Sequence, residues 1–215
     1  MQEYELNQAL QRTLPRARVA LTRPRGCPEI ALWLFDPQCL NGPLSHHEAQ
    51  AVVGEPAYWS FCWASGQVLA QWILDHPEVV EGRRVLDFGA GSGVVAIAAA
   101  MAGAKEVIAA DLDPDALIAA RVNASENGVR LATALDAAAC SGIDLLLAAD
   151  VLYDPENLPM LERFRGMADR VLMADSRLKT LGNEHYRRLE AREARTWPDL
   201  HEFEEFNRVR IYAAQ

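Results

Sequence analysis

A glycine-rich turn between an apolar strand and an apolar helix constrains the fold of this chain more than any other stretch. Residues 85–95 are Val-Leu-Asp-Phe-Gly-Ala-Gly-Ser-Gly-Val-Val, with glycines at positions 89, 91 and 93. Glycine lets the backbone turn tightly and approach a ligand, and the N-terminus of the following helix offers unpaired N–H groups at the positive end of its dipole. The pattern indicates a site for a nucleotide-type cofactor in an α/β protein.

The spacing of the turn favours one kind of nucleotide. A dinucleotide turn, Gly-x-Gly-x-x-Gly, would need glycine at Val94, whereas the third glycine stands at Gly93. Asp87 precedes the first glycine by two residues, where it would repel a pyrophosphate but attract a ligand ammonium. Asp111 follows at 111 − 87 = 24 residues, near the offset of about 20 at which an acid binds ribose hydroxyls.

An ammonium, a ribose and close backbone contact together predict S-adenosylmethionine as cofactor, with S-adenosylhomocysteine as its product. The acids Asp87 and Asp111 disfavour the alternative that Gly89, Gly91 and Gly93 only let a strand and a helix approach each other. They also make a dehydrogenase the weaker interpretation.

Apolar runs alternate with helical stretches from residue 84 onward, as in a parallel sheet covered on both faces. A helix is predicted from Pro114, after the cap Asp113, to the stop at Asn127-Gly128, and another near 181–191. The fold class predicted is α/β, a Rossmann-like doubly wound sheet of seven mostly parallel strands with an antiparallel last strand. The strands are expected at 84–88, 106–111, 130–134, 144–149, 170–174, 193–197 and 208–213.

The first part of the chain is predicted to be a small N-terminal extension, residues 1–55, packed on a core of residues 56–215. A hairpin of 18–22 with 30–35 and a helix opened by the capping box Ser45-x-x-Glu48 are expected there. His46 and His47 are adjacent and point apart on a helix, so we expect exposed histidines and no metal site.

Charge and composition limit the classes of molecule that this protein is expected to bind. The chain has 21 basic and 30 acidic residues, a formal charge of −9, which disfavours nucleic acid and suits a lysine-bearing protein surface. No apolar run is long enough to span a bilayer, and the polar start lacks the order of a secretory signal, so no membrane partner and a cytoplasmic location are expected. The oligomeric state is not encoded in a motif, and a monomer is favoured.

A second acid lies at the end of the apolar run 144–149. Asp150 and Tyr153 would stand beside the methyl group of the cofactor, because ligands bind at the carboxyl edge of an open parallel sheet. A nearby carboxylate raises the pKa of a lysine amine, so the better role of Asp150 is to bind and orient a lysine rather than to deprotonate it. In the aromatic cluster 58–63, Trp63 is a candidate to face the methyl sulfonium, with core packing as the equal alternative.

These motifs resemble the seven-strand lysine methyltransferases, including those that methylate the β-subunit of electron transfer flavoprotein. The resemblance rests on 56–67, 74–80, the glycine turn, Asp111-Leu-Asp-Pro and Asp150-x-x-Tyr153, and it covers roughly residues 19–175. It implies substrate engagement by Asp150 and Tyr153, and adenine contact near Leu135 and Asp136, where Ala134 offers no polar side chain. It also implies cofactor binding by Trp63, Asp87, Gly89, Gly91, Gly93 and Asp111.

Three functions follow from these predictions. The first is a protein-lysine N-methyltransferase whose substrate is a protein with an accessible lysine, such as the electron transfer flavoprotein β-subunit. The second is a small-molecule N-methyltransferase acting on a nicotinamide-like amine. The third is a cofactor-binding interaction protein without catalysis, which the presence of Asp150 and Tyr153 disfavours.

Overall fold

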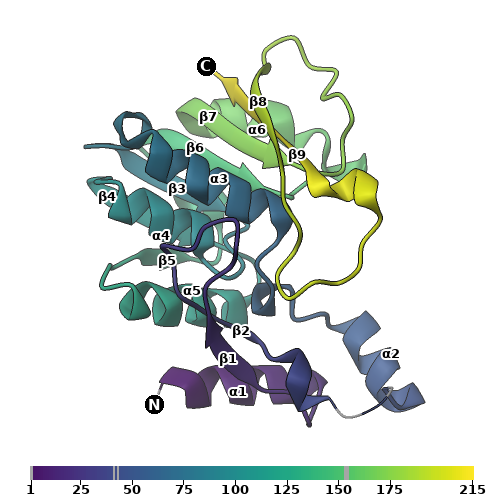
Figure 1. The fold of residues 1–215 in the computed structure, drawn as a ribbon. Coiled ribbons are helices and arrows are strands. Elements are labelled where there is room, and N and C mark those ends of the chain that lie inside the picture. The colour runs from purple at the N-terminus through teal and green to yellow at the C-terminus, as the bar shows by residue number, and fades with distance from the viewer. Residues whose placement is uncertain (1, 41, 43, 153–154) are drawn as a thin grey trace.

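The computed structural model describes residues 2–40, 42, 44–152 and 155–215. Its centre is a seven-stranded sheet in the order β5-β4-β3-β6-β7-β9-β8 (Figure 1). The strands from β5 to β7 are parallel to one another, and β9 is antiparallel to both β7 and β8. The predicted fold class is therefore confirmed. The strands are β3 (Arg84–Phe88), β4 (Glu106–Ala110), β5 (Ala132–Ala134), β6 (Ile143–Ala149), β7 (Ala168–Asp175), β8 (Arg187–Glu193) and β9 (Arg208–Ala214).

Helices cover both faces of this sheet because the central strands bury side chains on both sides. Val85 and Leu145 belong to the core under helices α3, α4 and α5, whereas Leu86 and Leu146 belong to the core that contains Phe164 of α6. Near-continuous apolar strands are what a doubly covered parallel sheet requires. The helices are α3 (Ala64–Asp75), α4 (Val94–Met101), α5 (Pro114–Glu126) and α6 (Met160–Met167).

The caps predicted for α5 are present. The side chain of Asp113 accepts from the N–H of Asp115, Pro114 occupies the first turn, and Asn127 ends the helix with Gly128 at φ +70°. A left-handed glycine after the last turn satisfies helix carbonyls at little conformational cost. The sequence therefore locates this helix to the residue.

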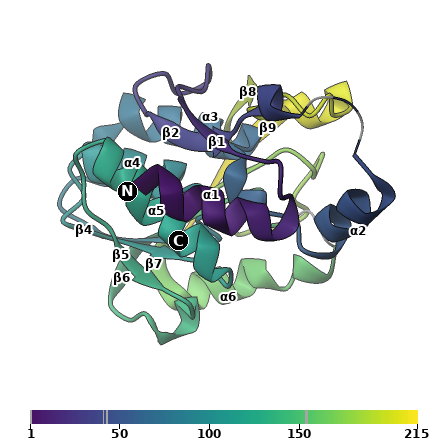
Figure 2. The same cartoon turned by 90° about the horizontal axis from the view of Figure 1, so that it is seen from below.

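The N-terminal part lies on the outer side of α5 (Figure 2). It contains the predicted hairpin, β1 (Val19–Thr22) paired antiparallel with β2 (Leu32–Phe35), and the helix α2 (His46–Gly54) behind its capping box. Asn123 of α5 accepts from the N–H of Trp33 at 2.8 Å, and Asn127, which caps this helix, accepts from the N–H of Ala31 at 2.9 Å. These contacts attach the hairpin to the helix that follows the second sheet strand.

No element is predicted above for residues 2–13, which form helix α1 (Gln2–Thr13). Its buried Leu6 and Leu10, together with Leu14 just beyond it, are four residues apart and pack with Ala116 and Val122 in one core. This is the spacing of one helical face, so the sequence does contain the signal.

The helix predicted at 181–191 is wrong, and so is the strand predicted at 193–197. Residues Arg187–Glu193 form strand β8 at the sheet edge, paired with β9 and interrupted by an irregularity between Arg188 and Glu190. The segment is rich in residues that favour helices, but pairing with β9 overrides that local preference. Because the irregularity interrupts the regular register, the alternation that would have indicated a strand is blurred.

Candidate functional site

The glycine turn lies at the point where the strand order reverses. β3 is flanked by β4 on one side and by β6 on the other, and the turn leaves the carboxyl end of β3 between them. Open α/β sheets bind ligands in the crevice at this place. The N–H groups of Gly89 and Ala90 both donate to the carbonyl of Ala110, at 2.9 and 3.0 Å, so the turn is fixed to the end of β4.

The glycines of the turn do not have the same role. At Gly91, φ is +51° and no atom lies within 4 Å of where a Cβ would stand. At Gly93, φ is +81° and a Cβ would lie 2.8 Å from Cα of Ala120 in α5. Gly91 thus leaves room for a ligand, whereas Gly93 allows α4 to begin in contact with α5.

Asp111 follows β4 and connects it to the turn. Its Oδ2 accepts from the N–H of Gly91 at 2.9 Å, and its Oδ1 accepts from the N–H of Asp113 at 3.0 Å. An ionised carboxylate has about four lone-pair directions, so these two bonds leave capacity for ligand hydroxyls. The carboxylate is half-buried beside the open space at Gly91.

Asp87 is 2% exposed and accepts from the N–H of Ala96 in α4 at 3.0 Å. Burial raises the pKa of Asp87 to about 7, and the nearby charge of Asp111 also raises it. A positive ligand group beside it would favour its ionised form. Contact between Asp87 and a ligand ammonium stays a prediction, because Asp87 also has this structural partner inside the fold.

Asp150 stands at the end of β6, on the other side of the turn from Asp111. Its carboxylate accepts from the N–H and the hydroxyl of Ser65, at 3.1 and 2.6 Å, and from the N–H and the hydroxyl of Ser176, at 3.2 and 2.8 Å. Its φ of 52° is left-handed, which costs energy in a residue other than glycine. Asp150 therefore joins the start of α3 to the end of β7, in addition to its predicted role toward substrate.

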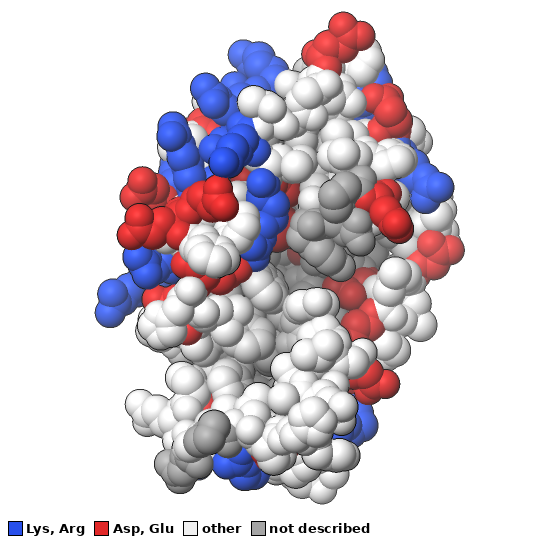
Figure 3. All heavy atoms as spheres, turned by 90° about the vertical axis from the view of Figure 1, so that its right-hand side faces the viewer, with Lys and Arg blue, Asp and Glu red and all other residues white. Residues whose placement is uncertain are grey.

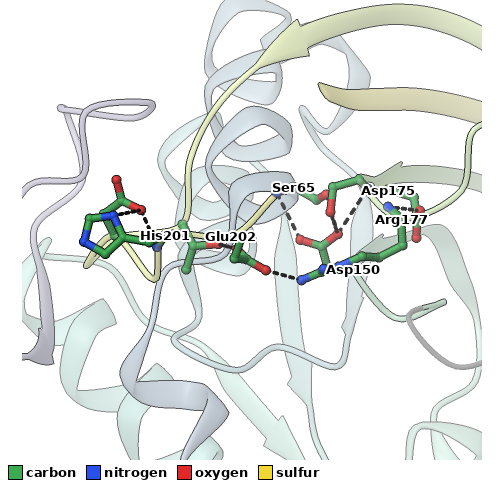
Figure 4. Close-up of polar contacts among 9 residues, drawn as sticks. Ser65, Asp150, Asp175, Arg177, His201 and Glu202 are labelled. Carbon is green, nitrogen blue, oxygen red and sulfur yellow. Dashed lines mark hydrogen bonds and ion pairs between the residues drawn. The ribbon is translucent and has the colours of Figure 1, made fainter. Parts of the chain in front are cut away.

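Asp175 ends β7 next to Asp150, because Ala149 and Ala174 are paired in the sheet. It is fully buried; its Oδ1 accepts from the N–H groups of Arg177 and Leu178, while its Oδ2 has no hydrogen-bond partner among the described residues. Burial raises the pKa of Asp175 to about 6, and the charge of Asp150 adds to this. Figure 4 shows the two acids on neighbouring strand ends.

Trp63 immediately precedes α3 and is half-buried. Its Nε1 donates to the carbonyl of Tyr58 at 3.1 Å, and its ring meets those of Tyr58 and Phe61 edge-on or tilted. It lies two residues before Ser65, which binds Asp150. Its contact with a sulfonium stays a prediction.

The segment after β5 carries the two residues expected near adenine. Leu135 is 55% exposed, and Asp136 caps a short 3-10 turn by accepting from the N–H of Ala138 at 2.9 Å. Leu112, which follows Asp111 at the end of the neighbouring strand β4, is 88% exposed. Two exposed leucines at adjacent strand ends offer apolar surface to a flat ring.

Tyr153 lies outside the described residues. Sequence reasoning missed Asp175, Ser65 as a partner of Asp150, and Ser176. Asp175 could have been found by the rule that selected Asp111 and Asp150, since it too ends a predicted sheet strand.

Within the described part of the chain, no three His, Cys, Asp or Glu side chains gather in a way that could hold a metal ion. None of the helices in those same residues is both long and apolar enough to cross a membrane.

Residues 68–153 match the family model described as ribosomal protein L11 methyltransferase (PrmA). The electron transfer flavoprotein beta subunit lysine methyltransferase of Danio rerio is 39% identical over 131 residues, which cover 59% of this chain and 50% of that protein. The protein of the same name from Rattus norvegicus is 34% identical over 69% of this chain and 60% of its own length. The chain thus spans between half and two thirds of these relatives.

Solved structures show the same fold at lower identity. Magnesium protoporphyrin IX methyltransferase from Synechocystis PCC 6803, solved with bound SAM, superposes with a TM-score of 0.53 over 81% of this chain and 86% of its own, at 19% identity. The ribosomal protein L11 methylase of Lactobacillus delbrueckii gives a TM-score of 0.53 over 70% of this chain and 78% of its own, at 21% identity. The chain therefore has the fold of the seven-strand methyltransferases, and its predicted resemblance to the lysine methyltransferases of that fold is confirmed.

Proposed function

We propose that this protein is an S-adenosylmethionine-dependent methyltransferase that acts on lysine side chains of a protein. One observation carries the proposal: the glycine turn, with open space at Gly91, lies between Asp111 at one strand end and Asp150 at another. Asp111 suits the binding of a methyl donor, and Asp150 suits the binding of the methyl acceptor. The similarity to electron transfer flavoprotein beta subunit lysine methyltransferases supports this substrate class.

The residues on the donor side fit S-adenosylmethionine. Asp111 has acceptor capacity left for two ribose hydroxyls, and it is fixed by its bond from Gly91 at 2.9 Å. The space at Gly91 admits the amino-acid part, while Leu112 and Leu135 offer apolar contact to adenine. When bound, the cofactor supplies a methyl group on a positively charged sulfur.

On the acceptor side, the protein must hold a lysine nitrogen in line with that methyl group. Alignment of this kind supplies much of the rate in a displacement reaction. Asp150 is well suited to it, because bonds from Ser65 and Ser176 fix the carboxylate in place: three of them end on Oδ1 and one on Oδ2, so Oδ2 can accept a further bond. Its charge attracts the ammonium form of lysine, and the proton leaves to water before the nitrogen attacks.

Charged side chains are unevenly distributed over one face of the molecule. Figure 3 shows acidic side chains at the left and right of this face, basic side chains gathered at its upper left, and a largely uncharged lower part. The net charge of −9 favours a lysine-rich partner over a neutral or acidic one.

The test is methylation of purified electron transfer flavoprotein with S-adenosylmethionine labelled in the methyl group. We expect label in the β-subunit, and loss of transfer in Asp150→Ala. A rise in melting temperature with S-adenosylhomocysteine checks that each variant still binds the cofactor. Label in nicotinamide but in no protein would favour the small-molecule methyltransferase instead. If S-adenosylhomocysteine fails to stabilise the wild-type protein, the donor assignment is wrong.

A further inference from the structure

The hydrogen bonds to the carboxylate of Asp150 are divided unequally between its two oxygens. Oδ1 accepts from the hydroxyl of Ser65 and from both the N–H and the hydroxyl of Ser176, at 2.6, 3.2 and 2.8 Å. Among the described residues, Oδ2 accepts from the N–H of Ser65 alone, at 3.1 Å. Each oxygen of an ionised carboxylate has about two lone pairs. The acceptor capacity of Oδ1 is therefore used in full, whereas Oδ2 can accept one more donor.

The source of these bonds distinguishes Asp150 from the other acids at the ends of sheet strands. Asp111 and Asp175 each accept from the N–H of the residue two positions later, which is a bond within a local turn. The hydroxyls that donate to Asp150 lie 85 and 26 residues away in the sequence. The direction of its carboxylate therefore depends on how α3 and β7 pack beside β6.

Both serines are buried, and each belongs to a different element of the fold. Ser65 lies in the first turn of α3, where the N-cap residue Trp63 makes no side-chain bond to the helix, and Ser176 directly follows β7 (Figure 4). Turning the carboxylate about its Cβ–Cγ bond would break the bonds from both hydroxyls. The two serines together therefore restrict its rotation.

We propose that Ser65 and Ser176 are positioning residues for methyl transfer: their hydroxyls hold Oδ1 of Asp150, which leaves Oδ2 to bind the substrate lysine. The proposal rests on the proposed function, since it concerns the acceptor half of the same site. Asp150 is partly exposed, whereas both serines are buried. The serines therefore act on the substrate only through Asp150.

The geometry of the reaction makes the direction of this carboxylate important. The lysine nitrogen must lie in line with the bond between the cofactor sulfur and its methyl group, and a misplacement of about 1 Å can cost about a hundredfold in rate. Without one hydroxyl donor, Asp150 keeps the charge that attracts lysine, but its carboxylate turns more freely. Loss of a serine hydroxyl should therefore slow the transfer step more than it weakens binding of the protein substrate.

The test compares Ser65→Ala and Ser176→Ala with the wild type in the methylation of purified electron transfer flavoprotein. Initial rates over a range of both substrates give kcat and separate KM values for the flavoprotein and S-adenosylmethionine. The matched control is Tyr186→Phe, which removes a buried hydroxyl that donates to the carbonyl of Leu161 at 2.7 Å and does not bond Asp150. Melting temperatures with and without S-adenosylhomocysteine report the stability and the donor binding of each variant.

We expect each serine variant to lower kcat about tenfold to a hundredfold, with the KM for S-adenosylmethionine unchanged. Such a fall in kcat marks an interaction that matters in the transition state. Tyr186→Phe should lose comparable stability and keep its kcat. Normal kcat in both serine variants, an equal fall in Tyr186→Phe, or a loss confined to the KM for S-adenosylmethionine would overturn the proposal.

Asp150→Glu tests the same idea without removing either hydroxyl, in case the serine variants fold poorly. It keeps the charge but moves the carboxylate by one methylene group, so kcat should fall; a wild-type kcat would overturn the proposal. Absence of transfer by the wild-type protein would instead refute the proposed function, so the two failures are distinguishable.

Discussion

Gly93 should be the position in the turn where an added methyl group costs the most stability. A Cβ there would lie 2.8 Å from Cα and 2.9 Å from Cβ of Ala120, and the residue has φ +81°. The atoms it meets belong to the backbone and the first side-chain carbon of a buried helix, so they cannot rotate away. Relief would require α4 and α5 to move apart.

Two terms make up the expected loss in Gly93→Ala. The left-handed conformation costs an alanine about 1–2 kcal/mol, and forcing a methyl group into a packed contact costs about 1–3 kcal/mol. Their sum is about 3.5 kcal/mol in the middle of both ranges. For a chain of this length each kcal/mol lowers the melting temperature by about 2–4 °C, so we expect a fall of about 7–14 °C.

Gly91→Ala is the matched control, because φ is +51° there and no atom lies within 4 Å of the added carbon. It should lose only the conformational term, about 1–2 kcal/mol, but it fills space that we assign to the cofactor. Thermal melts with and without S-adenosylhomocysteine separate the two effects. Gly93→Ala should lower the melting temperature of the free protein most, while Gly91→Ala should reduce the shift that the ligand produces. Equal melting temperatures for the two variants would refute the packing argument.

Three other changes test separate features of the structure. The pKa of Asp87, raised to about 7, means that the folded protein keeps a proton that the unfolded chain releases, so stability should fall as pH rises from about 4 to 7. In urea melts, the free energy of unfolding should fall by roughly 4 kcal/mol across that pH range. Asp87→Asn should abolish this fall. Asn123→Ala should cost about 2–4 kcal/mol, since it strands the N–H of Trp33 and the carbonyl of Ser92; no loss in a urea melt would contradict this. Phe164→Ala, fully buried against Phe88, should cost about 3–5 kcal/mol by the same measurement, and a value near zero would count against the α6 core.

The parts of the fold that the sequence predicts well are those specified by neighbouring residues. The strand, glycine turn and helix from Arg84 to Met101 follow one another without a gap, so apolar pattern and glycine spacing suffice. The caps Asp113 and Ser45 likewise act on N–H groups two or three residues away. Strand β8 is different, because its conformation depends on pairing with β9, which comes later in the chain.

The site shows the same division. Asp111 could be selected from the number of residues that separate it from Asp87 in the sequence, and Asp150 from its place after an apolar run. The partners of Asp150 could not, because Ser65 lies 85 residues away and Ser176 lies 26 residues away. Nor does the sequence indicate that the space beside Gly93 is filled by α5, whereas the space beside Gly91 is empty.

The bonds of Asp150 change how its substitution should be interpreted. Removing its carboxylate would leave the buried hydroxyls and N–H groups of Ser65 and Ser176 without their acceptor, so α3 and β7 would lose a connection at the same time as the substrate loses a charge. Loss of transfer in Asp150→Ala therefore combines a structural effect with a functional one. Asp150→Asn reduces the structural part, because its amide oxygen can still accept from the hydroxyls of Ser65 and Ser176. Normal stability together with weakened methyl transfer in Asp150→Asn would therefore identify a substrate role more directly than loss of transfer in Asp150→Ala.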